Sequence, residues 1–355
     1  MDRRSLIIGL AVLIAHPAIA ATRHHPKHKE AETRLSAEAV NGAEFKKGKP
    51  SSALYVRAQV LLDRARYSPG EIDAKDGANF KRALTAFAAD HNLKADGRLT
   101  PDLWEALKQI GNDPAIINYT TTKADAEGPL VKEIPRKLEE QADLDRLGYT
   151  DATEALAEKF HLAPALLKKL NPKAHFDEPG TEIVVPNVTP MATPKSAKRK
   201  DAPQVDRVEV DKQALTVRAF DASGKVVAVY PASVGSEEKP APDGEVEVTR
   251  IAYDPDYTYN PKYAFKGVEA DKKFTIKPGP NNPVGLVWIA LQGEGYGIHG
   301  TPEPGNIGKT ASHGCVRLAN WDALDLAQMV HKGTRVSFIN GKPSATEMEP
   351  EAKTE

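Results

Sequence analysis

The chain has 355 residues, with 48 Lys and Arg against 49 Asp and Glu, and a formal net charge of −1. This length favours two or three domains over a single hydrophobic core. The balanced charge excludes a molecule drawn as a whole to nucleic acid or to an anionic membrane. The sequence also has no phosphate-binding loop and no convincing set of metal ligands, so we expect no cofactor, no metal and no nucleic-acid partner.

The first residues are typical of an export signal. Arg3 and Arg4 precede a short apolar run, and the run ends in an Ala-x-Ala site at Ala20. The run is too short to span a bilayer. We therefore predict a signal peptide over 1–20, export to the periplasm by the Sec or the twin-arginine route, and no membrane contact after cleavage. The polar segment 21–48 is predicted to be a disordered tether that reaches the cell wall.

A compact helical domain is predicted over 49–110. Leu54, Ala58 and Leu61 recur at helical spacing, and Thr100 followed by Pro101 is typical of a helix start. The stretch YSPGEIDAKDGANFKRALTAFAADHNLKADGRLTPDLWEAL resembles the peptidoglycan-binding domain type 1. That resemblance implies three helices and glycan binding, and a packing role without a ligand remains the alternative.

A second small module is predicted over 143–188. Its text contains two short apolar helical patterns, the sequence Asn171-Pro172, and an apolar strand that ends at Pro186. This pattern resembles a LysM module, with its opening strand reduced to Leu147-Gly148-Tyr149-Thr150. The resemblance implies an α+β unit that either binds glycan or serves only as architecture.

The segment 206–340 is the largest predicted domain and is rich in β-strands. Apolar and polar residues alternate from Val208 to Ala219, as they do in strands with one buried face. An amphipathic helix is predicted to begin at Asn320, which we expect to cap it. Further strands are predicted over 225–230, 244–253, 284–291 and 334–339.

Two polar segments flank this domain. The linker 189–205 is rich in Pro, Ser, Thr and Lys, and the acidic tail 341–355 is predicted to be disordered. Such a linker offers few apolar groups for packing, so we expect small contacts between domains. The segment 206–340 should then fold and act alone.

The single cysteine of the chain lies in a polar, glycine-containing loop. One Cys cannot form an internal disulfide, and a thiol in such a loop should be exposed, with nearby imidazoles and amides favouring its thiolate. Backbone amides around it could also stabilise an oxyanion. The surrounding text is Gly297-Ile298-His299-Gly300-Thr301 and Ser312-His313-Gly314-Cys315-Val316-Arg317-Leu318.

These residues match the H-G…S/T-H-G-C-x-R signature of the L,D-transpeptidase (YkuD-type) family. The resemblance covers 206–340 and implies a β-rich, sandwich-like catalytic domain, preceded here by the three-helix domain and the LysM-like α+β module. Papain-like cysteine peptidases fit less well, because they place Cys at the start of a long helix with His far downstream.

The resemblance assigns a role to each residue of the motif. Cys315 would be the nucleophile, His299 the general base and the Gly300 carbonyl the group that orients the imidazole. His313, Gly314 and Cys315 would supply oxyanion-hole amides, with proton transfer by His313 as an alternative, and Ser312 would hold the loop. Arg317 would bind a substrate carboxylate or anchor the loop. Tyr296 and Trp288 could rim the cleft, although strand aromatics more often belong to the core.

The implied reaction is transfer of a peptidoglycan stem peptide. Cys315 would form an acyl-enzyme at the third stem residue, release D-Ala and pass the acyl group to an amine of a second stem, which gives a 3–3 cross-link. Water as acceptor would make an L,D-carboxypeptidase, and a protein amine would make a wall-anchoring transpeptidase. A non-catalytic peptidoglycan-binding protein is the alternative from another class. Carbapenems should acylate the same thiol.

Overall fold

The computed structural model describes residues 35–94, 96–191, 202–236, 239–263, 270–310, 312 and 314–341. From Leu35 onward the described residues form one compact unit. The predicted signal peptide, the middle of the predicted linker and nearly all of the predicted tail lie outside the described residues. No helix within these residues combines the length and apolarity needed to cross a bilayer.

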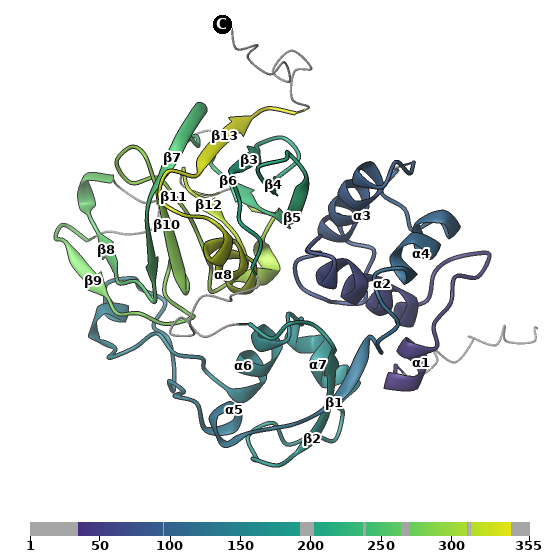
Figure 1. Ribbon diagram of the computed structural model, residues 1–355. Coiled ribbons are helices and arrows are strands. Elements are labelled where there is room, and N and C mark those ends of the chain that lie inside the picture. Colours follow the sequence, from purple (N-terminus) through teal and green to yellow (C-terminus); the bar gives the residue numbers. More distant parts are fainter. Residues whose placement is uncertain are drawn as a thin grey trace, which may run out of the picture. The chain divides into compact units, whose positions relative to one another are not determined.

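The predicted three-helix domain is present, and one further helix precedes it (Figure 1). The Thr100 side chain accepts a hydrogen bond from the Leu103 amide, so the predicted cap is confirmed. The prediction of a disordered tether is wrong for residues 35–48, because Leu35 and Val40 are buried there. One helical turn is too short to show an apolar period. The helices are α1 Ala37–Asn41, α2 Ser52–Arg64, α3 Ala78–Asp90 and α4 Pro101–Lys108.

A small α/β module follows, built on two antiparallel strands that are distant in sequence. β2 pairs with β1, with Ile116 opposite Pro186 and Thr120 opposite Glu182. Leu147–Thr150 is therefore not the opening strand, and the true one lies outside the predicted interval 143–188. The elements are β1 Ile116–Thr120, α5 Lys123–Glu127, the 3-10 helix η1 Glu140–Asp143, α6 Ala152–Lys159, α7 Pro164–Leu170 and β2 Glu182–Pro186.

The third part is a β-rich domain with a mixed, nine-stranded sheet in the order β5-β4-β3-β13-β7-β10-β11-β12-β6. β7 pairs with β13 along its first half and with β10 along its second half, so it joins two parts of the sheet. Helix α8 (Asn320–Met329) packs against β10 and β11 (Figure 1). The predicted multidomain, sandwich-like fold class is confirmed. The other elements are β3 Arg207–Asp211, β4 Thr216–Phe220, β5 Val226–Pro231, β6 Ser233–Val234, β7 Gly244–Tyr253, β8 Tyr257–Tyr259, η2 Pro261–Tyr263, β9 Phe274–Ile276, β10 Val287–Leu291, β11 Gly297–His299, η3 Pro304–Asn306, β12 Val316–Arg317 and β13 Arg335–Ile339.

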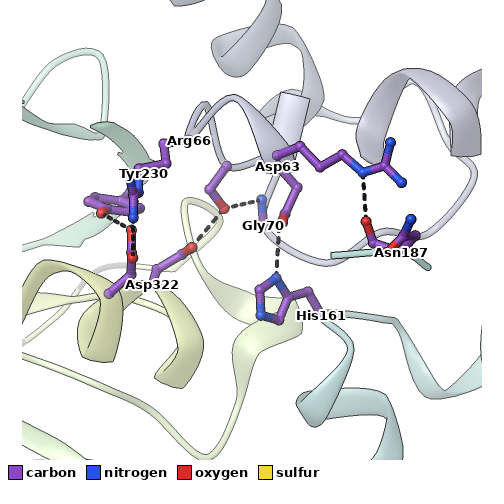
Figure 2. Close-up of polar contacts among 10 residues, drawn as sticks. Asp63, Arg66, Gly70, His161, Asn187, Tyr230 and Asp322 are labelled. Carbon is purple, nitrogen blue, oxygen red and sulfur yellow. Dashed lines mark hydrogen bonds and ion pairs between the residues drawn. The ribbon is translucent and has the colours of Figure 1, made fainter. Parts of the chain in front are cut away.

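The three parts are joined by hydrogen bonds and shared cores, so the prediction of small contacts between them is wrong. The Ser68 amide donates to the Val229 carbonyl at 2.8 Å, and Val229 is a member of the helical domain's core. The Ser68 hydroxyl donates to Asp322 at 2.9 Å. Figure 2 shows Asp322 in this region of contact, with His161 of the small module beside Asp63 of the helical domain. The linker composition could not reveal this, because the interface is built from strand and helix residues on either side of it.

Candidate active site

Two short parallel strands place the chemically important side chains of the motif on one face. β11 pairs with β12 so that His299 lies opposite Arg317, and Cys315 comes immediately before β12. Side chains two residues apart point to the same side of a strand, so Cys315, Arg317 and His299 share one face. All three line a cleft of about 750 Å³. The structure therefore brings the predicted nucleophile and base together.

The imidazole of His299 is held as a neutral ring. Its Nδ1 lies 2.7 Å from the Gly300 carbonyl oxygen, which can only accept, so Nδ1 carries the proton and Nε2 has the free lone pair. Burial, and after it the positive charge of Arg317, lowers the pKa of His299 to about 3. The indole of Trp288 stacks on the ring at 5.2 Å between centroids. Trp288 thus lines the cleft rather than the core.

The thiol of Cys315 differs from the prediction. The residue is half-buried, and its Sγ donates to the Gly295 carbonyl at 3.4 Å. Burial raises the pKa of the Cys315 thiol to about 11, although the Gly297 amide and Arg317 act in the opposite direction. The prediction that the loop exposes Cys315 and favours its thiolate is therefore wrong. A glycine-rich loop permits exposure, but here strands and aromatic side chains surround it.

The loop before Cys315 is fixed from behind. Ser312 is buried, its hydroxyl donates to the Cys315 carbonyl, and its amide donates to the Gly235 carbonyl at 2.9 Å. Gly314 lines the cleft with φ of +93°, a conformation that favours glycine. His313 lies outside the described residues. Ser312 therefore holds the loop and does not face the cleft.

Arg317 and two tyrosines complete the area around the thiol. Among the residues that the structure describes, no acidic side chain forms an ion pair with Arg317. Tyr296 lines the cleft, and its ring lies beside Gly314. The sequence interpretation missed Tyr257, whose pKa is raised to about 12 by burial and then by the charge of Cys315. The aromatic run Tyr257–Tyr259 between polar residues was the available signal.

Asn320 was predicted to cap the helix, and it does not. Ala319 is the cap residue of α8, and Asn320 is the first helical residue. The Asn320 side chain accepts from the Leu286 amide at 3.1 Å and donates to Glu158 of the small module at 2.7 Å. It thus faces the back of the site, where sequence alone gave it no partner.

Comparison with known proteins finds matches to the helical domain and to the β-rich domain. The L,D-transpeptidase catalytic domain matches residues 205–337, and the putative peptidoglycan binding domain matches 51–107, so both resemblances are confirmed. A putative L,D-transpeptidase YkuD of Bacillus licheniformis is 28% identical over 53% of this chain and 93% of its own length. The putative L,D-transpeptidase YqjB of Bacillus subtilis is 34% identical over 36% of this chain and 69% of its own. The catalytic domain of the Enterococcus faecium L,D-transpeptidase aligns with 38% of this chain and 96% of that one, at 22% identity and a TM-score of 0.30. The chain belongs to the L,D-transpeptidase family.

Proposed function

We propose that this protein is an exported peptidoglycan L,D-transpeptidase that uses Cys315 as nucleophile and His299 as general base. The observation that carries the proposal is the placement of both side chains in one cleft, with the unprotonated Nε2 as the only basic atom of the imidazole. A hydrogen-bonded carbonyl at Nδ1 serves the purpose that a carboxylate serves in other triads, because it fixes the tautomer and the ring plane. The imidazole of His299 and the Gly300 carbonyl are both neutral, which suits a site in which charge develops only during the reaction.

The reaction begins with attack of Sγ on the carbonyl of the third residue of a tetrapeptide stem. The thiol proton passes to Nε2 of His299 as the S–C bond forms, and the amides of Gly314 and Cys315, with that of His313, stabilise the oxyanion. The C–N bond to D-Ala then breaks, and His299 returns the proton to the leaving amine. An amine of a second stem attacks the thioester in the same manner and restores the thiol.

The high pKa of Cys315 and the low pKa of His299 favour a neutral thiol beside a neutral imidazole over a preformed thiolate–imidazolium pair. Proton transfer is therefore coupled to attack on a bound carbonyl, where the oxyanion hole offsets the cost of separating charge. This coupling protects a lone thiol in an oxidising compartment, because thiols oxidise through their thiolate form.

Arg317 is proposed to bind the carboxylate of the leaving D-Ala. It lies on the cleft face beside His299 and has no ion pair among the described residues, so its charge is available to a substrate. Tyr257 and Tyr296, which line the same cleft, would contact the stem. A guanidinium suits a planar carboxylate because two parallel hydrogen bonds can form.

The domain at 51–107 is proposed to hold the enzyme on peptidoglycan, and residues 1–20 to direct its export. Stem peptides are the proposed donors and a stem amine the proposed acceptor. Water or a protein amine would use the same acyl-enzyme.

Product analysis tests this proposal. Full-length protein incubated with disaccharide-tetrapeptide should form a 3–3 cross-linked dimer that has lost one D-Ala, that of the donor stem, detected by mass spectrometry. Cys315→Ala should form none, and His299→Gln should acylate about 10²- to 10⁴-fold more slowly, the usual contribution of a general base. Imipenem should add once to the wild type and not to the Cys315 variant. Tripeptide as the only product would identify a carboxypeptidase, and turnover by Cys315→Ala would overturn the proposed nucleophile.

A further inference from the structure

The geometry points to Glu158 of the small α/β module as a positioning residue for His299, acting through Asn320 and Gly300. The inference rests on the proposed role of His299 as general base. It adds that the small module belongs to the catalytic unit, because one of its buried side chains determines where the Gly300 carbonyl stands. Three steps lead from α6 to the imidazole.

The first step is the contact between Asn320 and the two glycines behind the cleft. A Cβ built on Gly300 would lie 2.0 Å from Oδ1 of Asn320, and a Cβ on Gly285 would lie equally close. Gly285 also has φ of +62°, which glycine tolerates best. The amide oxygen of Asn320 therefore sits in a space that only two glycines leave open. The backbone at Gly300 therefore packs directly against the Asn320 side chain, and a displaced Asn320 would remove this support.

The second step links that backbone to the base. The carbonyl of Gly300 accepts the Nδ1 proton of His299 at 2.7 Å, and it is the group that sets the ring orientation. The amide of Gly300 is held by the Val287 carbonyl at a longer 3.3 Å. The peptide at Gly300 thus depends on the tight fit against Asn320 as well as on strand pairing.

The third step fixes Asn320 itself. Its Nδ2 has two protons, one donated to Oε1 of Glu158 at 2.7 Å and one to the Pro280 carbonyl at 3.1 Å. Together with the bond from the Leu286 amide, these contacts give both polar atoms of the amide group a partner. Among the described partners of Asn320, Glu158 is the ionisable one, and it comes from α6 of the small module.

Glu158 is held equally firmly on its other side. The residue is 7% exposed, and its Oε2 accepts from the Tyr149 hydroxyl at 2.5 Å. Burial, and to a smaller extent the negative charges of Glu154 and Glu71, raises the pKa of Glu158 to about 7. A proton on the carboxyl would sit on the Tyr149 side, so Oε1 can accept from Asn320 in either protonation state. The support for Asn320 therefore persists on both sides of neutral pH.

A buried carboxyl at a domain junction can also serve only to hold the two domains together, with no effect on the catalytic base. Helix α8 provides a matched contact of that kind, because the Ser68 hydroxyl donates to Asp322 at 2.9 Å. This bond also joins a preceding domain to α8 and is also buried. It contacts neither Gly300 nor Gly285. Loss of the Ser68 bond should lower stability without moving the base.

The experiment compares full-length Glu158→Leu, Glu158→Gln and Ser68→Ala with the wild type on the soluble tetrapeptide donor. Glu158→Leu should lower kcat by about tenfold with KM nearly unchanged, because the base is misaligned while the cleft surface is intact. Glu158→Gln keeps an acceptor for Asn320 and an N–H for Tyr149, so it should retain kcat within about twofold. Ser68→Ala should lose thermal stability and keep kcat. Histidine ¹⁵N spectra should show the Nδ1–H form of His299 less populated only in Glu158→Leu.

Two results would overturn the inference: wild-type kcat in Glu158→Leu, or an equal loss of kcat in Ser68→Ala. If Glu158→Leu does not fold, Glu158→Asp replaces it, because a side chain one methylene shorter draws its oxygen away from Asn320 and should lower kcat in the same way. Cys315→Ala and His299→Gln are assayed alongside. Turnover by Cys315→Ala, or unchanged acylation by His299→Gln, would refute the proposed function itself, whereas inactive Cys315 and His299 variants with a fully active Glu158→Leu would refute only the positioning role.

Discussion

The two faces of the strand pair β11–β12 contrast in how they are built. The cleft face carries His299 and Arg317 beside Cys315, all within one short stretch of sequence. The rear face meets α8 and the small module, where Asn320 contacts a residue 162 positions away. The cleft face is open to a substrate, and the rear face is closed and fully hydrogen-bonded around Asn320. The comparison teaches that a local motif identifies the reacting atoms, while distant segments determine how firmly those atoms are held.

The test with the largest expected effect changes Gly300, the residue at which the two faces meet. Gly300→Ala places a methyl group where Oδ1 of Asn320 stands, since the Cβ would lie 2.0 Å away. The peptide must shift, and with it the carbonyl that orients His299. We expect kcat to fall about 10²-fold in a steady-state assay, with Cys315 still alkylated by iodoacetamide. A fully active variant would show that the two faces are independent.

A second test addresses the cleft face alone. With its pKa raised to about 11, the Cys315 thiol has a roughly 300-fold smaller thiolate fraction at pH 7 than an unperturbed thiol. The higher nucleophilicity of the thiolate recovers part of this, so iodoacetamide should react about 20-fold more slowly with the folded than with the unfolded protein. The measurement is alkylation rate against pH, with urea-unfolded protein as the control. A rate that levels off below pH 8 would contradict a buried, protonated thiol.

A third test removes the rear face. A chain that starts at Ala202 lacks the partners of Val229, Asp322 and Asn320. We expect its acylation rate to fall about tenfold and its thermal midpoint to drop, because buried polar groups lose their partners. Imipenem acylation followed by intact mass, beside the full-length protein, measures the first effect. Equal rates and equal midpoints would show that the catalytic domain is self-sufficient.

A fourth test concerns the pH dependence of stability. The pKa of Glu158 rises from 4.5 to about 7 on folding, so between these values the folded protein keeps a proton that the unfolded chain has lost. The free energy of unfolding therefore decreases with rising pH, by about 3 kcal/mol in all. Glu158→Gln lacks this titration. Urea unfolding of both proteins from pH 4.5 to 8 should show the wild type losing stability relative to Glu158→Gln, and parallel curves would contradict the burial of an ionisable group.

Local signals were sufficient for most elements of the fold. Thr100 capped its helix as predicted, and the alternation from Val208 to Ala219 became two paired strands. The motif also located the two side chains that meet in the cleft. In each case the information lies within a few residues, where periodicity, caps and motif spacing act.

Long-range packing accounts for what the sequence did not reveal. The partner of β2 is β1, and nothing near Ile116 identifies it as the opening strand of the small module. Asn is a residue type that often caps helices, yet the side chain of Asn320 forms hydrogen bonds with distant residues instead. The burial of Cys315 depends on surrounding residues such as Tyr257, which is far from the motif in sequence. These features need contacts that no local pattern encodes.

The hydrogen bonds on α8 also bear on the order in which the chain folds. The partners Ser68 and Asp322 are 254 residues apart in sequence, and Glu158 and Asn320 are 162 residues apart. Contacts of such high sequence separation form late, because each requires closure of a long loop. The chain is synthesised from its N-terminus. The helical domain and the small module therefore cannot complete their buried polar contacts until α8 has been synthesised. Assembly of the hydrogen bonds behind His299 is therefore among the last events of folding, and a chain interrupted before α8 never acquires the complete site.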